Sequence, residues 1–170
     1  MFYGIKEIAQ AGFVVDDLDA AAERWFKRGA GPFRAFRDLD VPIVYRDVPI
    51  TLKLSLALGY CDGVQIELIQ PLDDQPSGFR DRFPDGWPEE GLHHFGMIAN
   101  DFDLFVEKHV NQGHAIAMEG TFSGYRFCFI DTREKLGFML EGLERTPSFL
   151  SFFQEIRDLE IGWDGKTPFV

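Results

Sequence analysis

Apolar residues recur along the chain in short runs with the spacing of β-strands. The clearest run covers residues 50–58, where every second residue is a leucine. That period of two is typical of a half-buried antiparallel strand. Other runs end at turn residues such as the Asp62-Gly63 pair, which favours a hairpin. The strands predicted in this way are 8–15, 33–40, 50–58, 64–69, 94–99, 114–118, 126–131 and 138–141.

Two helices are expected between these strands, each after the first strand of a series. Acidic residues at 16–19 can cap a helix that continues to Phe26 and stops at the Gly/Pro segment 29–32. A second helix is predicted over 101–112 and ends at Gly113. Residues 71–91 between the two series are polar and rich in Pro and Gly, which indicates a linker with at most a helical turn near Phe79.

A third helix is predicted in the tail. Thr146 suits an N-cap and Pro147 suits the first helical position. The residues that follow with helical spacing form one apolar face: Phe149, Phe152, Phe153 and Ile156. We expect this helix to dock on its own domain; the alternative is that it covers a dimer partner or the mouth of a pocket.

The second half of the chain repeats the first. Residues 94–103 align without a gap on residues 10–19, so that Gly96 falls on Gly12 and Asp101 on Asp17. Two copies of one supersecondary unit explain this better than unrelated segments. We therefore predict an α+β fold in which two βαβββ modules in tandem form a curved mixed sheet around a central site, with a C-terminal helical tail. The whole chain 1–170 is expected to form a single domain, divided as follows: module one 5–72, linker 73–90, module two 91–144 and C-terminal extension 145–170.

Composition narrows the class of partner. The chain is 45% hydrophobic and carries a formal net charge of −11, which argues against nucleic acid or an anionic membrane as a partner. Cys61 and Cys128 form no disulfide framework. The N-terminus lacks the apolar core of a signal peptide, and no apolar run approaches the length of a membrane span. We expect a cytoplasmic protein that binds a small molecule.

Four polar residues interrupt the first and last strands of the two modules. They are Gln10 and Glu67 in module one, and His94 and Glu141 in module two. Buried carboxylates are costly without a compensating cation, and pseudo-twofold packing would bring the two pairs together. One imidazole, one amide oxygen and two carboxylates form a mixed N/O set that suits Zn, Ni, Co, Mn or Mg. His93 should point away from His94 and play a structural or supporting role.

These motifs resemble those of the vicinal oxygen chelate superfamily, which includes glyoxalase I, methylmalonyl-CoA epimerase and extradiol dioxygenases. In that family, paired βαβββ modules surround a metal, and the resemblance implies the ligands Gln10, Glu67, His94 and Glu141. This set is similar to that of glyoxalase I. The motifs that carry the resemblance are Gln10 to Val15 with Asp17-Leu18, Gln65 to Leu68 with Gln70-Pro71-Leu72, Gly91 to His94 with Gly96, and Asp131-Thr132 with Gly137 and Glu141. Gly91-Leu92-His93-His94 and Pro71-Leu72 look more like the epimerases.

The resemblance implies a metal-dependent enzyme, an isomerase or lyase. It would transfer a proton next to a carbonyl or thioester of a small, partly apolar substrate through a metal-stabilised enolate. Glu141 and Lys53 are the predicted catalytic residues. Lys53 is chosen because strand 50–58, where the epimerases carry a glutamate base, holds no carboxylate. Arg34, Arg37, Phe33 and Tyr125 are the predicted substrate-binding residues, and we expect a homodimer.

Two alternatives remain open. The first is a metal-free binding protein on the same fold, similar to the bleomycin-resistance proteins; two inward carboxylates argue against it. The second is an extradiol dioxygenase, which needs two His and one carboxylate for Fe(II). Gln10 stands where the first of those histidines should be, so we rank that class lower.

Overall fold

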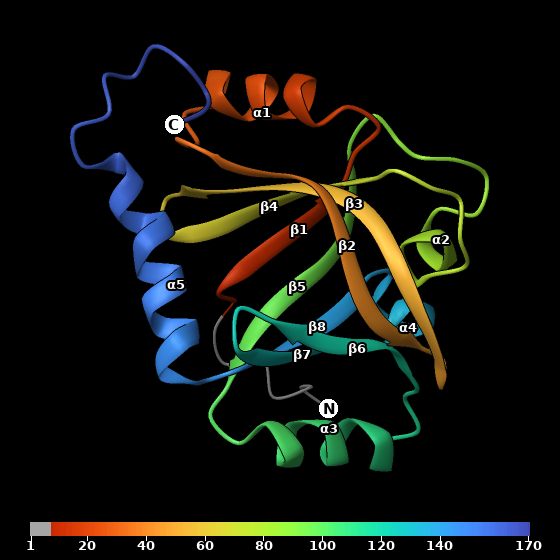
Figure 1. Ribbon diagram of the computed structural model, residues 1–170. Coiled ribbons are helices and arrows are strands. Elements are labelled where there is room, and N and C mark those ends of the chain that lie inside the picture. The colour runs from red at the N-terminus through yellow and green to blue at the C-terminus, as the bar shows by residue number, and fades with distance from the viewer. Residues whose placement is uncertain (1–7) are drawn as a thin grey trace.

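One closed sheet of eight strands forms the centre of the molecule (Figure 1). The computed structural model describes residues 8–170, so the predicted start of module one at residue 5 and the N-terminal segment lie outside it. The strands follow one another around the sheet in the order β1-β4-β3-β2-β6-β7-β8-β5. Their bounds are β1 Gln10–Val14, β2 Arg34–Tyr45, β3 Val48–Cys61, β4 Val64–Pro71, β5 Gly91–Ala99, β6 Ile116–Phe122, β7 Tyr125–Ile130 and β8 Met139–Glu144. The predicted α+β class with a curved mixed sheet is confirmed.

The two main helices occupy equivalent places in the repeat. Helix α1 (Leu18–Lys27) follows β1, and α3 (Phe102–Asn111) follows β5. The side chains of Asp17 and Asp101 accept hydrogen bonds from the backbone N–H three residues on, which satisfies a free donor of each first turn. Both helices lie outside the sheet, at opposite ends of the view in Figure 1. None of the helices in residues 8–170 combines the length and hydropathy needed to cross a bilayer.

The two modules meet along their first strands. β1 pairs antiparallel with β5, and each of them pairs parallel with the last strand of its own module, β4 or β8. The resulting order β4-β1-β5-β8 places the first and last strands of both modules side by side. At the other seam, β2 and β6 pair only at positions 43–45 and 118–120. The sheet is therefore closed by a long seam on one side and a short one on the other.

Strand β2 is longer than predicted. It runs to Tyr45 rather than to residue 40, and a bulge between Phe36 and Leu39 shifts its register. Asp38 in this bulge has a positive φ of 51°. One extra residue reverses the inside-outside alternation, which is why the pattern of 33–40 does not reveal the strand's full length.

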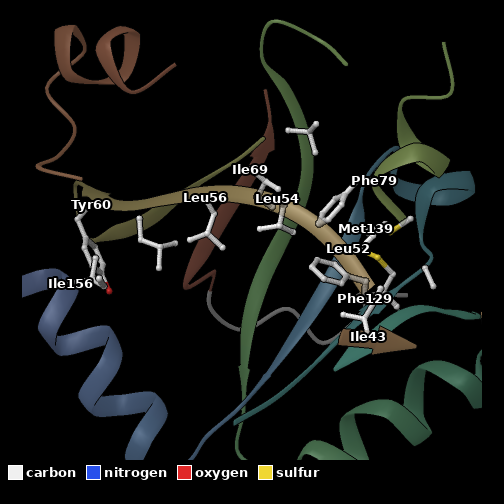
Figure 2. Close-up of a cluster of buried hydrophobic side chains, with 14 residues drawn as sticks. Ile43, Leu52, Leu54, Leu56, Tyr60, Ile69, Phe79, Phe129, Met139 and Ile156 are labelled. Carbon is white, nitrogen blue, oxygen red and sulfur yellow. The ribbon is translucent and has the colours of Figure 1, made fainter. Parts of the chain in front are cut away.

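The interior of the sheet is filled by aliphatic and aromatic side chains. Figure 2 shows Leu52, Leu54 and Leu56 projecting from β3 toward the inside. The C-terminal helix α5 (Pro147–Arg157) docks on this interior: Phe149 and Ile156 are buried, and Thr146 caps the helix. The short helices α2 (Gly78–Arg82), α4 (Arg133–Leu136) and the 3-10 turn η1 (Asp158–Glu160) complete the chain. Of these, α4 and η1 were not predicted.

Candidate metal centre

Strand register brings the four predicted ligand positions onto one patch of the inner surface. Gly12 of β1 pairs with Glu67 of β4 and with His94 of β5. In the same way, Gly96 of β5 pairs with Gln10 of β1 and with Glu141 of β8. Paired residues on neighbouring strands share a face. The four polar side chains therefore project to the same side, and each is paired with a glycine.

Three of the four side chains are within ion-pair distance. Nε2 of His94 lies 3.3 Å from Oε2 of Glu67 and 3.3 Å from Oε2 of Glu141. One ligand atom from each of these residues lies within 4.8 Å of the others. The side chains are 0% exposed for His94, 7% for Glu141 and 15% for Glu67. Two carboxylates and an imidazole thus converge in a largely buried place.

Three buried atoms at this place make no hydrogen bond within the described chain: Oε1 of Gln10, Nε2 of His94 and Oε2 of Glu141. The His94–Glu141 contact is short enough for an ion pair but is not aligned as a hydrogen bond. A buried polar atom without a partner is costly, so three of them gathered at one place are suited to bind a charged group. An amide oxygen, an imidazole nitrogen and carboxylate oxygens are ligands of divalent cations. The donor set fits such an ion.

Glycine at positions 12 and 96 keeps the space at the centre free. A Cβ on Gly12 would lie 1.9 Å from Cε1 of His94. A Cβ on Gly96 would lie 3.0 Å from Oε1 of Gln10 and 3.2 Å from Oε2 of Glu141. Neither glycine has a positive φ, so the need for glycine here is the close approach of the ligand side chains.

His93 orients the His94 ring. Nε2 of His93 lies 3.1 Å from the carbonyl oxygen of Gly78, which can only accept, so this nitrogen carries the proton and donates. Nδ1 of His93 then accepts from Nδ1 of His94 at 3.0 Å. Nε2 of His94 is left facing the carboxylates. The tautomer follows from this hydrogen-bond chain, and it is the one that a metal at Nε2 requires.

Gln10 is oriented by a residue that the sequence patterns did not single out. Its Nε2 donates to Oε1 of Gln65 at 2.8 Å, so its Oε1 faces the site. Gln65 is fully buried and pairs with Gln10 across β1 and β4. The signal for it was present in the sequence, because a second polar residue two positions before Glu67 shares its strand face.

The charges at the centre shift the pKa values of its groups. Burial opposes the charged form of His94, but Glu141 and Glu67 outweigh it and raise the pKa of His94 to about 9. Burial raises the pKa of Glu141, and His94 offsets part of that rise. Burial lowers the pKa of His93 well below its usual range, with His94 as the next cause, so His93 stays neutral.

An apolar pocket opens beside the four ligand positions. It contains about 690 Å³ of empty space, part of it open to solvent, and it is lined by Gln10, Glu67 and Glu141 together with leucines of β3 and phenylalanines of β7. Tyr125 also lines it. Burial and the two nearby carboxylates raise the pKa of Tyr125, so its hydroxyl keeps its proton and is a donor. Of the predicted substrate-binding residues, Tyr125 lies at the site.

The structure does not bring Lys53 to the site. Leu52 and Leu54 line the pocket, so Lys53 between them faces outward, where it is exposed. The prediction of Lys53 as a base is therefore corrected. Its alternation with the leucines was the signal that could have excluded it.

The remaining predicted substrate-binding residues also lie away from the pocket lining. Arg34 is near Glu155 at 3.7 Å, and Arg37 pairs with Asp19 on the outer surface. Phe33 is fully buried in the core under α1. Packing occupies Phe33 and an ion pair holds Arg37, so these two predictions are corrected; the role of Arg34 stays a prediction.

Comparisons with known proteins agree with this architecture. The sequence profile of the Glyoxalase/Bleomycin resistance protein/Dioxygenase superfamily matches residues 9–129. No curated protein sequence matches the chain.

Several solved structures share the fold. Methylmalonyl-CoA epimerase from Mycobacterium tuberculosis is 20% identical, with a TM-score of 0.57 over 85% of this chain and 91% of that one. A hypothetical protein from Bacillus halodurans C-125 is 15% identical, with a TM-score of 0.58 over 82% and 94%. A Streptomyces coelicolor methylmalonyl-CoA epimerase variant in complex with 2-nitronate-propionyl-CoA is 19% identical, with a TM-score of 0.52 over 83% and 95%.

The profile match covers more than half of the chain, from the first ligand strand to β7. It includes Gln10, Glu67 and His94, and Glu141 follows on the next strand. The chain belongs to the glyoxalase/bleomycin resistance protein/dioxygenase superfamily.

Proposed function

We propose that this protein is a metal-dependent enzyme of the glyoxalase and epimerase type. It moves a proton next to a carbonyl or thioester of a small, partly apolar substrate. The observation that carries the proposal is the convergence of unpaired ligand atoms on Gln10, His94 and Glu141, with Glu67 beside them, at the polar end of an apolar pocket. Gln10, Glu67, His94 and Glu141 would hold a divalent cation, which as a Lewis acid polarises a carbonyl oxygen.

The side chains around the pocket supply the other functions of such a site. Glu141 is the proposed base, because its carboxylate lines the pocket beside the other ligand positions, within reach of a bound substrate. Tyr125 keeps its proton and can donate a hydrogen bond to a substrate oxygen. The aliphatic lining excludes water, which strengthens the contact of Glu141 with the substrate and the hydrogen bond from Tyr125. The fold is shared with methylmalonyl-CoA epimerases.

Metal content tests the proposal directly. Protein purified without added metal should contain close to one divalent ion per chain by elemental analysis, and a chelator should lower its thermal stability. Glu141→Ala should lose the metal and keep its far-UV circular dichroism. Glu144→Ala is the matched control, because Glu144 is on the same strand but pairs with Arg126 on the outside. Substoichiometric metal together with no effect of chelator would refute metal dependence and favour the metal-free binding protein.

Deuterium exchange tests the proton transfer. In D₂O, metal-loaded protein should accelerate loss of the α-proton signal of 2-hydroxyacetophenone, which carries two neighbouring oxygens. Glu141→Ala should show no acceleration, and Glu144→Ala should match the wild type. Binding of this ketone by metal-loaded wild type with no exchange would contradict the proposed reaction.

A further inference from the structure

The polar groups of the pocket are confined to one end. Besides Gln10, Glu67, Glu141 and the hydroxyl of Tyr125, every side chain of the lining is aliphatic, aromatic or methionine. Four leucines of β3 belong to this apolar lining, and Figure 2 shows three of them, Leu52, Leu54 and Leu56, projecting to the inside one after another. No lysine, arginine or histidine belongs to this lining. A bound molecule would thus meet the four ligand positions at one place and hydrocarbon in the rest of the lining.

Cations close to the pocket point elsewhere. Lys53 projects from the outer face of β3 and is exposed. Arg34 lies near Glu155 on α5. Arg46 is held by Asp81 and Asp131 at 2.7 and 2.8 Å, at the far end of β2. A carboxylate on the part of a ligand that lies along the leucines of β3 would therefore be desolvated without a cationic partner in the lining. Burial of such an unpaired charge is unfavourable.

Aromatic side chains also close the short seam of the sheet. The first half of β2 does not pair with β6, because their ladder is limited to positions 43–45 of β2. Across this gap, Phe152 of α5 contacts Phe36 of β2 at a ring distance of 6.0 Å and Phe122 of β6 at 5.7 Å. Phe122 lines the pocket. The pocket is thus walled by hydrocarbon on this side as well.

We propose that the site selects an uncharged hydrophobic carbonyl compound and discriminates against one with a second, anionic group in its acyl or ring part. The carbonyl oxygen of the substrate faces the ligand positions Gln10, Glu67, His94 and Glu141, where the cation would be held, and the apolar part lies along the leucines of β3. This specificity rests on the proposed function for the role of the polar end. This specificity distinguishes the chain from an enzyme that acts on dicarboxylic acyl groups. The second carboxylate of such an acyl group needs a cationic side chain, and this lining has none.

Three hydroxamic acids test the specificity, since a hydroxamate presents two neighbouring oxygens to a metal. Acetohydroxamic, benzohydroxamic and 4-carboxybenzohydroxamic acid are titrated into cobalt-loaded protein by calorimetry. We expect the benzo compound to bind about tenfold or more tighter than the aceto compound, since burying a phenyl ring is favourable. The 4-carboxy compound should lose about tenfold or more relative to the benzo compound. Equal or tighter binding of the 4-carboxy compound would overturn the proposal.

A matched pair of variants locates the ring of the probe. Phe127 lines the pocket, whereas Phe138 packs against Phe95 outside it, and both are half-buried. Phe127→Leu should weaken benzohydroxamate several-fold and leave acetohydroxamate unchanged. Phe138→Leu should change neither. If both variants behave alike, the ring does not occupy this pocket and the proposal fails.

Failure of the proposed function and failure of the specificity give different results in these experiments. If the protein binds no metal and no hydroxamate, the proposed function fails. The specificity is then tested on metal-free protein by equilibrium dialysis with acetophenone and 4-carboxyacetophenone. Preference for acetophenone supports the neutral pocket without a metal, and preference for the carboxylate refutes it.

Discussion

Replacing Gly12 with alanine tests the geometry of the centre with a single methyl group. The Cβ would lie 1.9 Å from Cε1, 2.3 Å from Nε2 and 2.4 Å from Nδ1 of His94. Ordinary van der Waals contact begins at 3.4 Å, so the ring would have to move by about 1.5 Å. The ring is fully buried, is hydrogen-bonded to His93 and packs on Phe129 at 4.9 Å.

The sign of the change in stability separates this clash from the usual effect of a Gly→Ala substitution. Gly→Ala at a position with ordinary φ stabilises a protein by about 0.4–1 kcal/mol through the unfolded state. An overpacked core instead costs about 1–3 kcal/mol, which lowers Tm by roughly 2–12 °C in a chain of this size. Gly12→Ala should therefore destabilise the metal-free protein. It should also weaken metal binding by about 100-fold or more, because it displaces a ligand rather than a supporting residue.

Gly96→Ala is the matched control on the equivalent strand. Its Cβ would meet Oε1 of Gln10 at 3.0 Å and Oε2 of Glu141 at 3.2 Å, so these side chains need to yield by only a few tenths of an ångström. We expect a change in stability below about 1 kcal/mol. Thermal unfolding of the metal-free proteins and calorimetric titration with Zn²⁺ measure both effects. If Gly12→Ala matches Gly96→Ala in the Tm of the metal-free proteins, the His94 ring is not seated as described.

Further predictions concern the hydrogen bonds and charges. His93→Leu should weaken metal binding by about 10–100-fold with an unchanged circular dichroism spectrum. His93→Gln can still donate to Gly78 and accept from His94, so it should recover most of the metal affinity. Equal loss of affinity in both variants would contradict the orienting role of His93. Because the pKa of metal-free His94 is about 9, binding of Zn²⁺ at pH 7 should release close to one proton. Calorimetry in buffers of different ionisation enthalpy measures this, and no release would mean that His94 is not a ligand. Arg133, with Arg46, holds the pKa of Asp131 below its usual range, so Asp131 stabilises the fold above pH about 4 and loses this effect as the pH falls. Asp131→Asn should lower Tm at pH 7, and a deficit that does not shrink in acid would refute the charge-based explanation.

Much of the fold follows from local patterns in the sequence. The leucine alternation of β3, the capping aspartates of α1 and α3, and Thr146-Pro147 before α5 are local signals, and each element formed near its predicted place. The bulge in β2 was not readable, because one inserted residue reverses the alternation on which the prediction depends.

The sequence by itself determined the four candidate ligand positions, because the repeat places Gln10 on His94, and Glu67 and Glu141 each interrupt the last strand of a module. Only the tertiary structure decided that these positions meet, since strand register across β4-β1-β5-β8 is set by pairing between segments far apart in the chain. Register also placed a glycine beside each ligand position and turned Lys53 outward. A period of two indicates which residues share a face, but not which face is enclosed once the sheet closes.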